Sequence, residues 1–80
     1  MKAEKEKNSD IVFEIIRKIG QLSQSSKGWS KELNLVAWNG GPAKYDLRDW
    51  SPDYEHMSRG ITLHREEAKN LLELLSTEDL

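Results

Sequence analysis

The stretch that decides the fold runs Lys44-Tyr45-Asp46-Leu47-Arg48-Asp49-Trp50-Ser51-Pro52-Asp53. Its side chains alternate with a period of two, as in a β-strand with two different faces. One face carries Tyr45, Leu47 and Asp49, whereas the other carries Lys44, Asp46, Arg48 and Trp50. Pro52 lacks the backbone N–H that a sheet ladder needs, so the strand ends there. The pattern predicts an apolar face that packs on a neighbour and a second, cation-and-aromatic face that is a working surface.

A second alternating segment lies directly upstream, in residues 33–38. Leu33, Leu35 and Ala37 share one of its faces, and Asn34, Val36 and Trp38 share the other. Asn39-Gly40-Gly41-Pro42 follows at once, and such residues supply the positive φ angles of a tight reversal. We therefore expect a hairpin that places Trp38 on the strand beside the one with Arg48 and Trp50.

The flanking segments extend this hairpin to a four-stranded sheet. Residues 11–19 are mostly β-branched or aromatic, which favours a strand that continues irregularly to Ser23, although the isoleucines would also form a helical stripe. Residues 25–28 have the composition of a turn, and residues 54–59 that of a polar loop. Residues 60–63, Gly-Ile-Thr-Leu, form a short fourth strand.

A helix is expected after the fourth strand. Its acids, Glu66 and Glu67, fall in the first turn, where the helix dipole favours negative charge. His64 is the predicted N-cap with Glu67 as its capping-box partner, and a start two residues earlier, at Thr62, is the alternative. The apolar residues recur at helical spacing. Four of them make a stripe wider than one small sheet needs, so we expect a dimer interface at Leu71, Leu72, Leu74 and Leu75.

Length and composition bound the class of protein. The chain has 80 residues, 36% of them hydrophobic, and no cysteine. Residues 1–9 have no large apolar side chain after Met1, so we expect a disordered tail followed by one domain over residues 10–80. A core of this size supplies about 3–5 kcal/mol, which favours oligomerisation. Without cysteine, a disulfide scaffold and a thiolate metal site are excluded, in keeping with a reducing cytoplasm.

Charge is segregated along the chain although the net charge is only −2. Eight Lys or Arg and five acids lie between Arg17 and Arg65, whereas five acids and one Lys follow from Glu66 to the end. A net negative charge argues against binding duplex DNA by bulk electrostatics, and a solvated surface of mixed charge is the simplest alternative. No long apolar run and no signal peptide is present, so no membrane partner is expected.

Catalytic patterns are lacking in the sequence. The histidines, His56 and His64, are isolated, and Asp53 and Glu55 are too close together for a calcium loop. Ser51 has no glycine elbow, and Gly40-Gly41 is explained by the hairpin. We therefore expect no enzyme, no metal and no cofactor.

The aromatic residues have two interpretations. Any single one of Trp29, Trp38, Trp50 and Tyr45 fits a hydrophobic core. Together with Lys44 and Arg48, however, Trp38 and Trp50 suit single-stranded nucleic acid, whose bases stack on rings while cations neutralise phosphates. From the residues alone, single-strand binding and a sheet that takes a polypeptide partner, as in an adaptor protein, remain equal alternatives.

From about Phe13 to Leu75 the sequence resembles the single-stranded-DNA-binding transcriptional coactivators called positive cofactor four, especially the small bacterial members of the YdbC type. The matching segments are Lys27-Gly28-Trp29, Lys31-Glu32-Leu33-Asn34, Val36-Ala37-Trp38-Asn39, the stretch from Lys44 to Asp53, and Gly60-Ile61-Thr62-Leu63 before the helix. The resemblance implies an α+β fold, ββββα, in which two protomers dimerise and present curved sheets to single-stranded DNA.

The resemblance also implies roles for individual residues. Trp38 would stack on a base, Arg48 would contact a phosphate, and Trp50 would be the aromatic at the far end of that strand. The supporting basic positions would be Lys44, Arg59, Lys31 and Lys27. It predicts a cytoplasmic, nucleoid-associated homodimer that binds single-stranded DNA, with RNA as a further candidate ligand, and that serves transcription or repair machinery.

Overall fold

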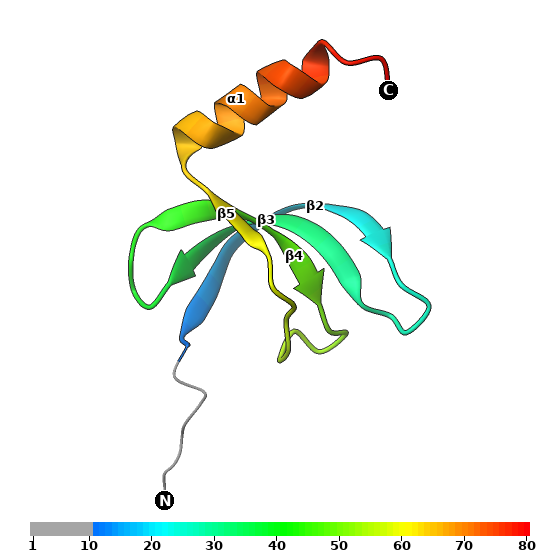
Figure 1. Ribbon diagram of the computed structural model, residues 1–80. Coiled ribbons are helices and arrows are strands. Elements are labelled where there is room, and N and C mark those ends of the chain that lie inside the picture. Colours follow the sequence, from blue (N-terminus) through cyan, green and yellow to red (C-terminus); the bar gives the residue numbers. More distant parts are fainter. Residues whose placement is uncertain (1–10) are drawn as a thin grey trace, which may run out of the picture.

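The computed structural model describes residues 11–80, so the tail expected at residues 1–9 lies outside the described residues (Figure 1). The described elements are β2 (Phe13–Gln24), β3 (Ser30–Trp38), β4 (Ala43–Trp50), β5 (Ile61–Leu63) and α1 (Arg65–Ser76). The strands form an antiparallel sheet in the order β2-β3-β4-β5, and the helix follows it. The predicted ββββα fold is confirmed.

The β3–β4 hairpin forms at the predicted place. Asn39 and Gly40 both have positive φ, at 52° and 75°, as the reversal requires. The N–H of Gly41 donates to the carbonyl of Trp38 at 2.9 Å and closes the turn. The register then pairs Glu32 with Arg48 and Asn34 with Asp46, which brings polar residues of both strands to the same face.

Strand β2 is irregular, as its sequence predicted. Its pairing with β3 shifts register between Ile15 and Arg17, between Lys18 and Gly20, and between Gln21 and Ser23. Bulges of this kind bend a strand and increase its twist. The sheet is accordingly strongly curved, and α1 lies on the outside of the curve (Figure 1).

The curvature gives the sheet an inner and an outer face. The inner face comprises Glu32, Asn34, Val36 and Trp38 of β3 and Lys44, Asp46, Arg48 and Trp50 of β4. Of these, Asn34, Val36, Asp46 and Trp50 are fully buried and Glu32 is 5% exposed. The face expected to be an open working surface is therefore largely the interior of the protomer. Asp46 can be buried because it is paired with Arg48, and Glu32 can be buried because it accepts hydrogen bonds from Tyr54 and Asn34.

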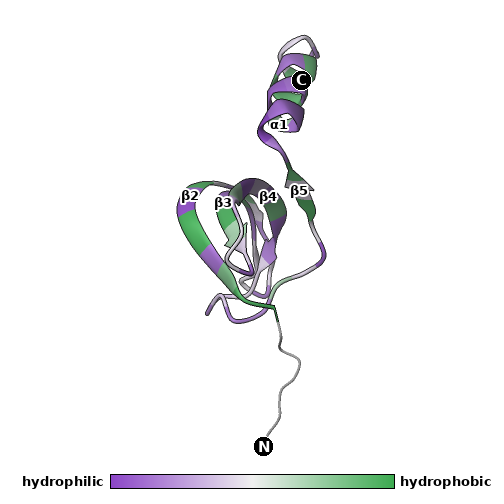
Figure 2. Cartoon of the chain, turned by 90° about the vertical axis from the view of Figure 1, so that its left-hand side faces the viewer, coloured by the Kyte–Doolittle hydropathy of each residue, from purple (hydrophilic) through white to green (hydrophobic). Residues whose placement is uncertain are grey.

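The outer face comprises Leu33, Leu35 and Ala37 of β3, Tyr45 and Leu47 of β4, and Leu63 of β5. All of these side chains are only half-buried. The helix lies over part of this face but stands away from it (Figure 2), and none of the helical residues is buried. An apolar groove of about 440 Å³ remains between Leu33, Tyr45 and Leu63 on the sheet and α1.

Helix α1 begins as predicted. His64 is the N-cap, and its backbone N–H donates to the Glu67 carboxylate at 2.8 Å. This capping bond explains why the helix starts at Arg65 and not two residues earlier. Within residues 11–80 no helix is long and apolar enough to cross a bilayer.

Candidate nucleic-acid interface

Trp38 lies at the last position of β3, directly before the hairpin turn. Its indole is half-buried, and the Arg48 guanidinium lies over the ring with Cζ 4.6 Å from the ring centroid. Phe13 approaches the same indole in a tilted arrangement, with 6.0 Å between ring centroids. Trp38 is thus held in place by a cation–π contact and an aromatic neighbour while part of it remains accessible.

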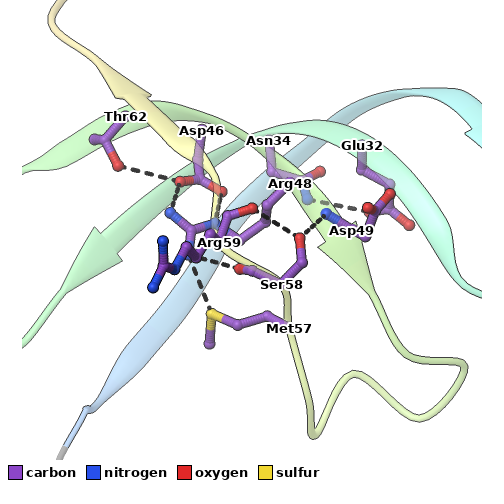
Figure 3. A network of polar contacts seen from close by, with 9 residues as sticks. All are labelled: Glu32, Asn34, Asp46, Arg48, Asp49, Met57, Ser58, Arg59 and Thr62. Atoms are coloured by element: carbon purple, nitrogen blue, oxygen red, sulfur yellow. Dashed lines mark hydrogen bonds and ion pairs between the residues drawn. The ribbon is translucent and has the colours of Figure 1, made fainter.

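Arg48 is anchored on both sides. Its Nε and Nη2 donate to the two carboxylate oxygens of Asp46 at 2.6 and 2.7 Å, in a bidentate ion pair (Figure 3). The hydroxyl of Thr62 also donates to this carboxylate, at 3.2 Å. On its other side Arg48 donates through Nη1 to the carbonyl of Ser58 at 3.4 Å. The charge of Arg48 is therefore matched within the protomer.

The chain crosses Arg48 closely where the loop enters β5. A Cβ placed on Gly60 would lie 2.3 Å from the carbonyl oxygen of Leu47 and 2.5 Å from the Cβ of Arg48. Only glycine fits such an approach. Arg59, the preceding residue, is exposed. Arg59 therefore lies directly before the point where the chain crosses Arg48.

Trp50 occupies a different environment from the one expected. It is fully buried, with its ring centroid 5.1 Å from Phe13 and 5.9 Å from Tyr54. The loop after β4 folds back beneath it, because the N–H of Ser51 donates to the carbonyl of His56 at 3.0 Å. A ring enclosed in this way has no free face for a base, so Trp50 belongs to the core that supports the site.

The predicted basic residues are not all in one place. Lys44 is half-buried on the inner face, two residues from Asp46. Lys31 lies on the opposite face, 50% exposed, with Nζ 3.4 Å from the Asp49 carboxylate. Lys27 is exposed in the turn between β2 and β3, at the end of β3 remote from Trp38. The structure therefore brings Arg48 onto Trp38, places Lys44 on the same face of the sheet, and separates Lys27 and Lys31 from them.

A second polar group on the inner face was missed by the sequence reasoning. The Nζ of Lys18 lies 3.7 Å from the centroid of the Tyr54 ring, and the Tyr54 hydroxyl donates to Glu32 at 2.5 Å. Tyr54 has a positive φ of 61° within an irregular loop, and Lys18 lies beside a register shift. Neither follows a periodic pattern, so no signal in the sequence places them together.

The surroundings of the Glu32 carboxylate favour its ionised form. Burial by itself would raise its pKa, but the hydrogen bonds from Tyr54, Asn34 and Ser30 outweigh burial and lower the pKa below the ordinary 4.5. The positive charge of Lys18 acts in the same direction. Among residues 11–80 there is no cluster of three or more His, Cys, Asp or Glu that could hold a metal ion.

The four leucines expected at a dimer interface are all exposed in the protomer. Leu72 and Leu74 are 69% and 66% exposed, and Leu71 and Leu75 are 37% and 46% exposed. Three of them, Leu71, Leu72 and Leu75, line the apolar groove against the outer face. The groove and these side chains form a continuous apolar area, which is unusual for a small protomer that stays alone.

The family model of Transcriptional Coactivator p15 (PC4) matches residues 25–74, from the turn after β2 to the last part of α1. The chain belongs to this family. PC4-family proteins bind single-stranded DNA, and the family is not one of enzymes. A relative from Treponema pallidum (strain Nichols), described only as an uncharacterized protein, is 48% identical over 73 residues, which are 91% of this chain and 86% of the relative.

Proposed function

We propose that this PC4-family protein binds single-stranded DNA as a homodimer, with little sequence specificity, in a transcription- or repair-linked role. The observation that carries the proposal is the partly exposed Trp38 indole held against Arg48 at 4.6 Å. An aromatic ring fixed beside cations suits a flexible strand, because any base stacks on it while the cations neutralise phosphates. RNA offers the same groups and is a second candidate ligand.

The cations divide into two roles in this proposal. Lys44 and Arg59 form no ion pair with another residue of the range 11–80, and we assign the phosphate contacts mainly to them. Arg48, whose charge is matched by Asp46, acts chiefly by holding Trp38. Lys27, in the turn at the other end of β3, would extend the path of a longer strand, and Lys31 would join it only where the strand reaches the outer face.

Dimerisation is supported by the uncovered apolar area. A twelve-residue helix with no buried residue gains little stability from its own hydrogen bonds. A second copy placed on the groove between Leu33, Tyr45 and α1 would bury that area in both protomers. The alternative of a protein–protein adaptor that uses the exposed sheet face is less favoured, because residues 25–74 match a family of single-stranded-DNA-binding coactivators.

A titration with oligo-dT, followed by tryptophan fluorescence, tests the proposal. Single strands should bind more tightly than a duplex of equal length, since duplex bases are hidden from stacking. Trp38→Ala should lose about 1–3 kcal/mol of binding with little change in salt dependence. Lys44→Ala should instead reduce the slope of log K against log salt by about 0.7, and Arg48→Ala should reduce it less. Equal or tighter binding of the duplex would contradict the proposal.

A further inference from the structure

A polar hollow of about 310 Å³ lies at the other end of the inner face from Trp38. It is lined by residues of β2, of the turn between β2 and β3, of β3 and of the loop after β4, among them Gln21, Gln24, Ser30, Glu32, Pro52 and Tyr54. Glu32 and Trp38 are six positions apart on β3, which corresponds to about 20 Å along the strand. The volume is at the lower limit of the range for sites that hold a small organic group.

The hydrogen-bond acceptor in this hollow is the carboxylate of Glu32, which is held in one position. Glu32 is 5% exposed, and its position is set by Tyr54, which donates to Oε2 at 2.5 Å, and by Asn34, which donates to Oε1 at 3.1 Å. An ionised carboxylate is an acceptor only, with about four lone-pair positions, so these two bonds leave further positions, which the Ser30 hydroxyl also approaches. A ligand that enters the hollow must bring hydrogen-bond donors to Glu32.

The other polar groups of the hollow complement this acceptor. Gln21 and Gln24 are exposed side chains of β2 and are paired across the strands with Glu32 and Ser30. Each amide carries two N–H donors as well as one acceptor, and Gln21 already donates one N–H to the carbonyl of Ser23 at 3.3 Å. Lys18, over the Tyr54 ring, brings a positive charge close enough to act on Glu32, and this offsets the repulsion between the carboxylate and a phosphate.

We propose that the hollow is a guanine-binding subsite for a base of the bound single strand, an inference that rests on the proposed function. Single-stranded bases are read along their Watson–Crick edges. Guanine presents two adjacent donors there, N1–H and the exocyclic amine, which match a carboxylate, and its O6 accepts from an amide. Adenine and cytosine each place one donor beside an acceptor, and thymine places its single donor between two carbonyls. The subsite adds a preference at one nucleotide to binding that is otherwise insensitive to sequence.

The test compares three single strands of equal length: oligo-dT, the same strand with one central guanine, and the same strand with hypoxanthine in that place. Hypoxanthine keeps N1–H and O6 but lacks the exocyclic amine. We expect the guanine strand to bind at least about fivefold more tightly than oligo-dT, since one bidentate base contact discriminates by that much or more. The hypoxanthine strand should lose most of this preference.

Variants of the residues that line the hollow test whether the preference for guanine arises there. Glu32→Gln should bind oligo-dT as the parent does but should lose the preference for guanine. Glu55→Gln is the matched control, because it removes the same charge from an exposed residue of the neighbouring loop and should keep the preference. Since Glu32 is buried, its variant could unfold. The double variant of the exposed amides, Gln21→Ala with Gln24→Ala, provides the second test and should reduce the preference at least about twofold.

The outcomes separate the two proposals. If oligo-dT binds and the guanine strand binds equally, the subsite is wrong while the proposed function stands. If the preference survives in folded Glu32→Gln or in the double variant, the subsite is also wrong. If the wild-type protein binds none of the three strands, the proposed function fails and the subsite fails with it.

Discussion

On the inner face of the sheet the buried residues include Glu32, Asn34 and Asp46, whereas the outer face carries aliphatic residues that remain half-exposed. This is the reverse of what hydropathy alone suggests for a lone protomer. The inner residues can be buried because each charge has a partner at hydrogen-bond distance. The outer residues stay uncovered because a single short helix does not reach across them. The inner face of the protomer is therefore packed against its own chain, whereas the outer face remains partly uncovered.

Two ion pairs on β4 make the comparison testable. Asp46 is fully buried and paired with Arg48, and Asp49, three residues on, forms an exposed pair with Lys31. Asp46→Ala should cost about 3–5 kcal/mol of unfolding free energy, because it leaves a partly buried guanidinium uncompensated. Asp49→Ala should cost at most about 1 kcal/mol. Denaturant unfolding of both variants measures these costs. Similar losses of unfolding free energy in the two variants would contradict the distinction between the inner and outer faces.

Two tryptophans of the inner face provide a second comparison. Trp50 is fully buried, so Trp50→Ala should cost about 3–5 kcal/mol of unfolding free energy through lost contacts and a cavity. Trp38 is half-buried, so Trp38→Ala should cost clearly less. Thermal or denaturant unfolding of each variant, measured beside its binding of oligo-dT, separates support of the fold from contact with the ligand. A greater loss of stability in Trp38→Ala would place Trp38 in the core instead.

A charge introduced on α1 beside the uncovered outer face should weaken dimerisation. If a second copy covers the outer face, Leu72→Glu should weaken association by about 1.5–3 kcal/mol, the value of one buried leucine. Glu73→Gln, at the neighbouring exposed position, is the control and should leave association unchanged. Sedimentation at micromolar concentration measures the effect. The melting temperature of the parent should also rise with protein concentration, and a folded monomer with a constant melting temperature would exclude the dimer.

The smallest expected effect is on the pH dependence of stability. The pKa of Glu32 is lower in the folded protein than its ordinary value of 4.5. Its contribution is therefore fully present above about pH 4.5 and is lost as the pH falls through the lower folded value. Glu32→Gln should remove this part of the acid dependence, so its unfolding free energy should fall less steeply below pH 4.5. If the unfolding free energies of the parent and of Glu32→Gln depend on pH in the same way, the folded protein does not lower the pKa of Glu32.

Local patterns were sufficient for the secondary structure. The Asn39-Gly40 turn, the alternation around Leu47 and the His64–Glu67 cap depend on residues close in sequence, and their predictions are confirmed. The site was only partly predictable. Strand parity correctly placed Trp38 beside Arg48, but it could not show that a loop would enclose Trp50. The contacts of Lys18 with Tyr54 were missed because 36 positions separate them and a bulged strand breaks the alternation.

The strands, the hairpin, the helix start and the side chains that share a face could all be predicted from the order of the residues, because they follow from backbone geometry and the period of two. Which face of the sheet is interior could not be predicted in this way. That choice depends on the curvature produced by the bulges of β2, on the close approach at Gly60, and on the pairing of Arg48 with Asp46. The bulges of β2 and the approach at Gly60 join segments that are close only after the chain has folded. Asp46 and Arg48 are neighbours on one strand face, but the free energy of burying their charges depends on what the folded chain places around them.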